Sequence, residues 1–187
     1  GSSLFIDSEL QVAEKDEKKY SGQFVNSALS LSKDNSNAAI IGGGDGGVAR
    51  ECLLKGFDLI DWYELDPEVV KVCQKHLPKI CGEVKANNNV KCYWGDAFES
   101  IKKVKDSKYD KIFVDLNDDQ FCIDLAAKNM KGLKRILKPG GVITAQVGCL
   151  SKKPKQVNNW VKVLSQNFGN SKLDEVVIPS FDCRWNF

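Results

Sequence analysis

Short hydrophobic runs alternate with longer amphipathic stretches along most of the chain. Five of these runs are bounded by turn-forming residues and are short enough for strands buried in a sheet. The predicted strands are Ala38–Ile41, Leu59–Glu64, Val90–Trp94, Lys111–Asp115 and Gly141–Val147. The last of them is expected to follow a turn at Pro139-Gly140-Gly141.

Helical patterns occupy the stretches between these runs. The predicted helices cover Tyr20–Leu31, Val48–Lys55, a segment that starts with Asp66 as N-cap and Pro67 as first helical residue, Ile123–Leu137 and Val157–Phe168. Strands that alternate with helices predict an α/β fold with a doubly wound, mostly parallel sheet. Near the end of the chain, Glu175–Ile178 and Arg184–Phe187 could close the fold as an antiparallel strand pair.

The 187 residues suffice for one domain with a sizeable core. Residues 1–3 are interpreted as the remnant of a cloning tag, residues 4–32 as an extended β-segment and helix that lead into the domain, and residues 33–187 as the domain itself. The chain starts inside a β-segment and stops inside a predicted strand, so we expect truncated ends, above all the C-terminal one.

Composition and charge exclude several classes of function. The net charge of +2 gives no global bias toward nucleic acid or an anionic membrane. No apolar run approaches a membrane span and no secretory signal leads the chain, which favours a cytoplasmic location. The basic runs Lys102–Lys105 and Lys152–Lys155 lack interleaved aromatic residues and are interpreted as solvated surface rather than a nucleic-acid site.

Cysteine and histidine usage points away from disulfides and metals. Seven cysteines form no C-x-x-C pair, and most stand in apolar runs, which predicts reduced, buried thiols. The single histidine, His76, falls at the end of a predicted helix, so no ligand set for a metal is expected.

A glycine-rich loop connects the first predicted strand to its helix. Gly42, Gly44 and Gly47 satisfy G-x-G-x-x-G, a pattern shared by dinucleotide-binding and S-adenosyl-binding folds. Asp45 stands inside this loop and would repel a pyrophosphate at the helix N-terminus. A cofactor that carries a sulfonium or ammonium group instead of phosphate is therefore favoured.

Acidic residues also mark the ends of the next three strands. Glu64 ends the second strand, twenty residues after Gly44, where a carboxylate commonly accepts ribose hydroxyls. Asp96 follows the third strand, where it could hold an adenine amino group, and Asp115 ends the fourth. Ligands of open α/β sheets bind outside the carboxyl ends of the strands, so these acids predict an anionic crevice suited to a cationic substrate.

These motifs together resemble the polyamine aminopropyltransferases, the spermidine and spermine synthases. The resemblance covers most of the chain and rests on Leu4–Asp7 through Tyr20, Ile40–Gly47, Glu64–Asp66, Gly95–Ala97, Tyr109–Asp115 and Leu137–Gln146. Lys79–Val84 and Asp115-Leu116 look closer to spermine synthase, whereas Asp118 resembles the second aspartate of the spermidine synthase loop.

The resemblance implies a Rossmann-like catalytic domain of the class I S-adenosylmethionine methyltransferase type. It implies decarboxylated S-adenosylmethionine as co-substrate, methylthioadenosine as product, a small cationic amine as acceptor and a possible homodimer. Asp115 would be the general base. The implied cofactor contacts are Gln11, Gly42, Gly44, Asp45, Glu64, Asp96 and Ala97, and the implied acceptor contacts are Tyr20, Asp118 and Phe181.

The acceptor half departs from the family pattern. Phe181 replaces a tyrosine, Cys183 falls where spermine synthase has an acid, and the loop after Asp118 is unlike that of either synthase. The acceptor therefore stays open between putrescine and spermidine. Two alternatives remain, an S-adenosylmethionine-dependent amine N-methyltransferase and a non-catalytic member of the family.

Overall fold

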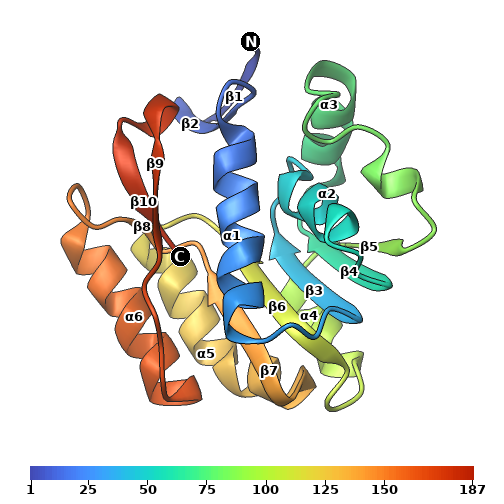
Figure 1. The fold of residues 1–187 in the computed structure, drawn as a ribbon, viewed down its shortest axis with the longest axis vertical. Helices are drawn as coiled ribbons and strands as arrows, with labels where there is room; N and C mark the ends of the chain where they lie inside the picture. The colour runs from blue at the N-terminus through green and yellow to red at the C-terminus, as the bar shows by residue number, and fades with distance from the viewer.

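The computed structural model describes residues 1–187 and is built on a five-stranded, fully parallel sheet. Its strands are β3 (Asn37–Gly42), β4 (Leu59–Glu64), β5 (Val90–Trp94), β6 (Tyr109–Asp115) and β7 (Leu137–Ala145). Their order in the sheet is β5-β4-β3-β6-β7, so the chain winds outward from β3 first in one direction and then in the other (Figure 1). The predicted doubly wound sheet is confirmed.

Helices cover both faces of this sheet. They are α1 (Glu17–Leu31), α2 (Gly47–Leu54), α3 (Pro67–His76), α4 (Ala97–Ser100), α5 (Gln120–Ile136) and α6 (Pro154–Phe168), with short 3₁₀ turns at Val84–Ala86, Ile101–Lys103 and Pro179–Phe181. No helix combines the length and apolar character that crossing a membrane requires.

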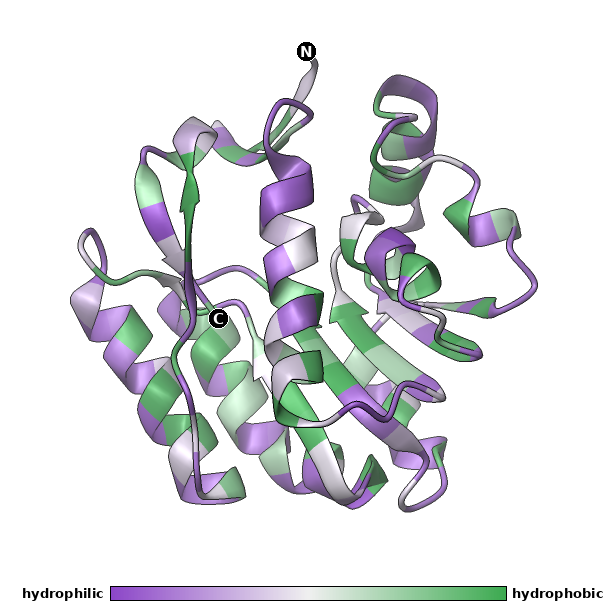
Figure 2. Cartoon of the chain, in the orientation of Figure 1, coloured by the Kyte–Doolittle hydropathy of each residue, from purple (hydrophilic) through white to green (hydrophobic).

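Alternate residues of the central strand enter two separate cores. Ala38 and Ile40 pack with α1, α2 and α3, whereas Ala39 and Ile41 pack with α4, α5 and α6. A strand with both faces covered must be apolar at every position, which explains why β3 shows as an unbroken hydrophobic run. Figure 2 shows the same division, with hydrophobic colour in the central strands and mixed stripes along the helices.

The N-terminal segment is a hairpin of β1 (Ser3–Ile6) and β2 (Glu9–Ala13). The extended structure predicted for residues 4–13 is confirmed, although the sequence pattern did not reveal the turn that divides it. That turn places Asp7 and Ser8 in the left-handed region, with φ of 50° and 66°. It folds β1 back onto β2 near the N-terminal end of α1 (Figure 1).

A second, antiparallel sheet closes the C-terminal side of the molecule. The predicted pair is confirmed as β9 (Glu175–Ile178) and β10 (Cys183–Asn186), and β10 also pairs with a short unpredicted strand, β8 (Gly148–Cys149). This pairing brings Cys149 and Cys183 together as a disulfide with a Cα–Cα distance of 6.3 Å. The prediction that all cysteines are reduced thiols was therefore wrong for these two, because only the tertiary strand pairing makes them neighbours.

Strand β7 begins earlier than predicted. Tyr109 pairs with Leu137 and Lys111 pairs with Val142, so three extra residues of β7 bulge out of the ladder. Gly140 lies in this bulge with φ of 76°. The turn expected at Pro139-Gly140-Gly141, before the strand, is therefore a bulge within β7.

Candidate active site

A cavity of about 790 Å³ opens at the carboxyl ends of the parallel strands. This edge contains the point between β3 and β6 where the strand order reverses, the usual ligand site of doubly wound sheets. All residues predicted for the site line this one cavity: Gln11, Tyr20, Gly42, Gly44, Asp45, Glu64, Asp96, Ala97, Asp115, Asp118 and Phe181. The structure thus brings the whole predicted set together.

The glycine loop is fitted tightly against the end of β6. Gly42 and Asp115 are register partners across the two strands, and the Gly43 N–H donates to the Asp115 carbonyl at 3.0 Å. Gly42 has φ of 84°, and a Cβ there would lie 2.4 Å from the Asp115 carbonyl oxygen. Only glycine fits this position, so the loop and Asp115 are held in fixed relation.

Asp45 lies at the N-terminal end of α2, where its Oδ1 accepts a hydrogen bond from the Gly47 N–H at 2.7 Å. Burial and the negative charge of Asp115 raise the pKa of Asp45 to about 8, although the Gly47 N–H and Arg50 counteract the rise. The Asp45 carboxyl forms no ion pair within the protein, so a positively charged group in the cavity would stabilise its ionised form.

Asp115 accepts a hydrogen bond from the Tyr20 hydroxyl at 2.7 Å from its Oδ1. Burial raises the pKa of Asp115 to about 6, and the charge of Glu64 adds to the rise while the Tyr20 bond lowers it. The same burial, together with Asp115, raises the pKa of Tyr20 well above its ordinary value. Tyr20 therefore stays a neutral donor that orients Asp115.

Glu64 and Asp96 each use part of their carboxylate to fix the local backbone. The Asp66 N–H donates to Oε1 of Glu64 at 2.9 Å, and burial raises the pKa of Glu64. Asp96 is the N-cap of α4 and accepts from the Phe98 N–H at its Oδ1, at 2.8 Å. In both side chains the second oxygen is left for a ligand.

Aromatic side chains form the wall opposite these acids. Tyr20 and Phe181 meet edge to face with ring centroids 6.2 Å apart, and Phe181 and Trp185 lie 4.7 Å apart. Trp185 also donates from Nε1 to Gln146, which lines the cavity. Aromatic faces next to carboxylates suit an alkyl ammonium, which has both a cationic head and an apolar body.

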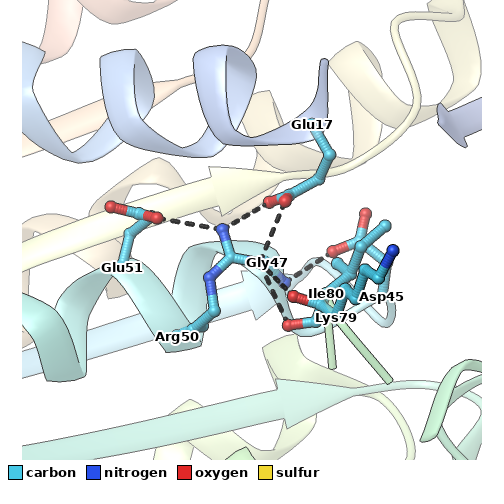
Figure 3. A network of polar contacts seen from close by, with 7 residues as sticks. All are labelled: Glu17, Asp45, Gly47, Arg50, Glu51, Lys79 and Ile80. Atoms are coloured by element: carbon cyan, nitrogen blue, oxygen red, sulfur yellow. Dashed lines mark hydrogen bonds and ion pairs between the residues drawn. The ribbon is translucent and has the colours of Figure 1, made fainter. Parts of the chain in front are cut away.

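A buried salt bridge that the sequence pattern does not predict joins α1 to α2, the helix that follows the glycine loop (Figure 3). Arg50 donates to both carboxylate oxygens of Glu17, at 2.9 and 2.8 Å, and to Glu51 at 2.9 Å. The Arg50 guanidinium also donates to the carbonyl of Ile80 at 3.1 Å. We call Glu17, Arg50 and Glu51 the Arg50 clamp. It holds the helix that carries Tyr20 against the helix that Asp45 precedes.

The part of the cavity lined by Asp118 and Phe181 contains an unexpected cation. Lys153 lies within 3.2 Å of Oδ2 of Asp118, and Lys152 donates to the Phe181 carbonyl at 2.8 Å. Both lysines line the cavity. The side chains of Lys152 and Lys153 are 50% and 43% exposed, in keeping with the interpretation of Lys152–Lys155 as solvated surface, and each also contacts a residue of the cavity wall. These contacts form because the turn between β8 and α6 brings the two lysines to the cavity, and the sequence does not predict this turn.

The raised pKa of Asp45 predicts how stability depends on pH. An aspartate of the unfolded chain ionises near pH 4, so between about pH 4 and pH 8 the folded protein binds more protons at Asp45 than the unfolded chain does. The free energy of unfolding should therefore fall as pH rises through this window, by at most ~1.4 kcal/mol per unit from this group. Asp45→Asn should gain stability relative to the native chain as pH rises. Urea denaturation at pH 5, 6.5 and 8 measures the difference, and a difference independent of pH would contradict the shift.

Solved structures with the same fold include spermidine synthases. One, crystallised with the transition-state analogue AdoDATO, superposes with a TM-score of 0.89 at 20% identity and covers 96% of this chain and 62% of its own. The spermidine synthase of Thermotoga maritima gives a TM-score of 0.87, also at 20% identity, with the same coverage. At this identity the likeness concerns the fold.

Sequence similarity is higher to polyamine aminopropyltransferases of Prochlorococcus marinus. The protein of strain MIT 9215 is 34% identical over 97% of this chain and 65% of its own length, and that of strain AS9601 is 36% identical over 100% and 68%. The chain thus spans about two thirds of the length of these relatives. The family model described as "Spermine/spermidine synthase domain" matches residues 17–187. The chain therefore belongs to the spermine/spermidine synthase family.

Proposed function

We propose that the chain carries the active site of a polyamine aminopropyltransferase, which transfers the aminopropyl group of decarboxylated S-adenosylmethionine to an amine such as putrescine or spermidine. The observation that carries this proposal is the pair of carboxyl groups of Asp45 and Asp115, which line one cavity, where burial and the negative charge of Asp115 raise the pKa of Asp45. A cavity with this charge suits a sulfonium and an ammonium together.

The adenosyl part of the co-substrate would lie along the ends of β3, β4 and β5. The second oxygen of Glu64 would accept the ribose hydroxyls, and the second oxygen of Asp96, together with Ala97, would contact the adenine; all three residues line the cavity. Gly42 and Gly44 would let the backbone approach the ligand closely, and Gln11 of β2 would contact it from the hairpin side. Asp45 would bind the ammonium of the aminopropyl arm.

The reaction is a displacement at the carbon next to the sulfonium. The lone pair of the acceptor nitrogen forms the new C–N bond, the C–S bond breaks, and its electron pair stays on sulfur as the neutral thioether of methylthioadenosine. An alkyl ammonium has no free lone pair, so a base must first accept its proton. Asp115 is the residue proposed for this step, because a pKa of about 6 leaves it ionised at neutral pH and still basic. Tyr20 occupies its Oδ1, and Oδ2 is left for the proton.

Holding the two reactants in line supplies the larger part of the rate. Well-oriented reactants avoid about 7–11 kcal/mol of the barrier in favourable cases, more than a general base contributes. Tyr20 and Phe181 would confine the acceptor amine between aromatic faces, with its nitrogen directed at Asp115.

A comparison of two co-substrates tests the proposal. The chain is incubated with putrescine or spermidine and either decarboxylated S-adenosylmethionine or S-adenosylmethionine, and the products are identified by mass. We expect aminopropylated amine and methylthioadenosine only from the decarboxylated form, because Asp45 would repel the carboxylate of the other. A methylated amine would favour the amine N-methyltransferase alternative. Absence of any methylthioadenosine binding in calorimetry would contradict both.

A further inference from the structure

Asp16 lies at the N-terminal end of α1, where an aspartate usually caps the helix. Such a cap accepts a hydrogen bond from a backbone N–H of the first helical turn. The Asp16 side chain forms no bond of this kind, although the residue is only 5% exposed. Capping of α1 therefore does not account for this buried carboxylate.

Both oxygens of the Asp16 carboxylate instead accept hydrogen bonds from Ser180, which lies 164 residues away in the sequence. The Ser180 N–H donates to Oδ2 at 2.6 Å, and the Ser180 hydroxyl donates to Oδ1 at 2.8 Å. Ser180 is the middle residue of the 3₁₀ turn Pro179–Phe181. Two charge-assisted hydrogen bonds to one residue fix its position, so the turn is held at the start of α1.

The turn contributes to the aromatic wall of the cavity. Ser180 and Phe181 line the cavity, whereas Asp16 does not. Phe181 packs against both Tyr20 and Trp185, with ring centroids 6.2 and 4.7 Å away. The place of Phe181 in the cavity therefore depends on where Asp16 holds Ser180.

Asp16 is itself held in a fixed relation to Asp115. The next residue along α1 belongs to the Arg50 clamp. Tyr20 follows Asp16 by four residues, which places both on one side of the helix, and its hydroxyl donates to Asp115 at 2.7 Å. The first turn of α1 thus connects the turn that carries Phe181 to the carboxyl of Asp115.

We propose that Asp16 is a positioning residue, which sets the place of Phe181 through Ser180. Phe181 in turn keeps the acceptor amine in line with Asp115. This role rests on the proposed function, since it concerns the acceptor of that reaction. Asp16 lies outside the cavity lining, so its loss should affect the alignment of the amine and leave the cofactor contacts intact.

Kinetics test this role, with decarboxylated S-adenosylmethionine saturating and putrescine or spermidine varied. Asp16→Ala removes both hydrogen bonds and should lower kcat/KM for the amine by about 10²-fold, the cost of a misplacement of roughly 1 Å. In Asp16→Asn the amide oxygen can accept from the Ser180 N–H and the amide nitrogen can donate to the hydroxyl, so this variant should stay within a few-fold of native. The Kd of methylthioadenosine should be the same in both variants.

Glu14→Gln is the matched control. It removes a negative charge two residues before Asp16, where the side chain accepts a hydrogen bond only from the Ser2 N–H, and should leave kcat/KM unchanged. A native-like kcat/KM in Asp16→Ala would overturn the inference. An equal loss in Asp16→Asn would do the same, because the charge of Asp16 rather than its hold on Ser180 would then matter.

A double-mutant cycle with Phe181→Ala tests whether the effect passes through Phe181. Removal of Asp16 should cost little once the Phe181 ring is absent, whereas a general structural role would give the same loss in both backgrounds. Ser180→Ala removes one of the two hydrogen bonds and serves in the same cycle if Asp16→Ala does not fold. Equal losses with and without the Phe181 ring would overturn the inference.

Fluorescence tests the position of Phe181 without turnover. In a Trp94→Phe background, Trp185 is the one tryptophan that is not buried. Asp16→Ala should increase the quenching of Trp185 by acrylamide relative to Asp16→Asn, because Phe181 no longer covers its ring, and equal quenching would overturn the inference. A native chain without aminopropyl transfer would contradict the proposed function, and quenching would still decide whether Asp16 holds Phe181.

Discussion

Replacement of Asp115 by asparagine is expected to lower the rate of aminopropyl transfer by about 10²–10⁴-fold, the usual contribution of a general base. Asparagine has nearly the same shape and can still accept the Tyr20 hydrogen bond that the carboxylate accepts at 2.7 Å. It cannot accept a proton from the acceptor ammonium. The loss should therefore appear in kcat, while the Kd of methylthioadenosine measured by calorimetry stays within a few-fold of the native value.

Asp119→Asn is the matched control for this variant. Asp119 is the N-cap of α5, its Oδ1 accepts from the Cys122 N–H at 2.8 Å, and it does not line the cavity. Asparagine caps helices as well as aspartate does, so this change should leave both rate and stability near native. Full activity of Asp115→Asn would remove Asp115 from the proton transfer and direct attention to another carboxyl of the cavity.

The convergence of acidic residues at the ends of the parallel strands could be predicted from the sequence because a parallel sheet imposes this geometry. The strands of a parallel sheet are rich in apolar residues and all their carboxyl ends meet at one edge, so acids at the ends of successive strands converge. Glu64, Asp96 and Asp115 follow three such runs and line one cavity. The glycine loop could also be predicted from the sequence. Its close approach to Asp115 leaves no room for a side chain at Gly42, and the sequence shows this requirement directly as glycine.

The part of the cavity lined by Asp118 and Phe181 could not be predicted in the same way. Its defining contacts join residues far apart in the chain: Lys153 pairs with Asp118, and Cys149 with Cys183 across 34 residues. Both pairs depend on β8, a two-residue strand that exists only through its pairing with β10. Two residues have no periodicity, so no local pattern predicts them. Lysine at 153 was therefore indistinguishable from any other lysine of a basic run.

The Arg50 clamp could not be predicted from the sequence for a related reason. Its removal is the second change for which we expect a large effect. Glu17 and Arg50 stand 33 residues apart. Glu17 precedes the helix predicted over Tyr20–Leu31, whereas Arg50 falls within the one predicted over Val48–Lys55. The Glu17 side chain is 2% exposed and that of Arg50 is 16% exposed. Two hydrogen bonds join them in a bidentate pair, and Glu51 accepts a further hydrogen bond from the same guanidinium.

Arg50→Met is expected to lower the free energy of unfolding by about 3–5 kcal/mol, because it leaves the buried Glu17 carboxylate without its cation. Chemical denaturation measures the change. The double variant Glu17→Gln with Arg50→Met should recover a large part of the loss, since no unpaired charge then remains buried at Glu17. Lys71→Met breaks an exposed pair with Glu68 and should cost less than about 1 kcal/mol.

The size of the Arg50→Met effect also reports on the site. The clamp joins α1, which carries Tyr20, to α2, which follows Asp45, so its loss should loosen the two helices that frame the proposed reaction centre (Figure 3). Weaker methylthioadenosine binding should therefore accompany the lower stability, and the double variant should restore both together. If Arg50→Met lowered the free energy of unfolding by less than about 1 kcal/mol, the clamp would be no stronger than an ordinary surface ion pair. The relation between α1 and the glycine loop would then depend on their apolar contacts, in which Phe24, Val25, Val48 and Ala49 share one core.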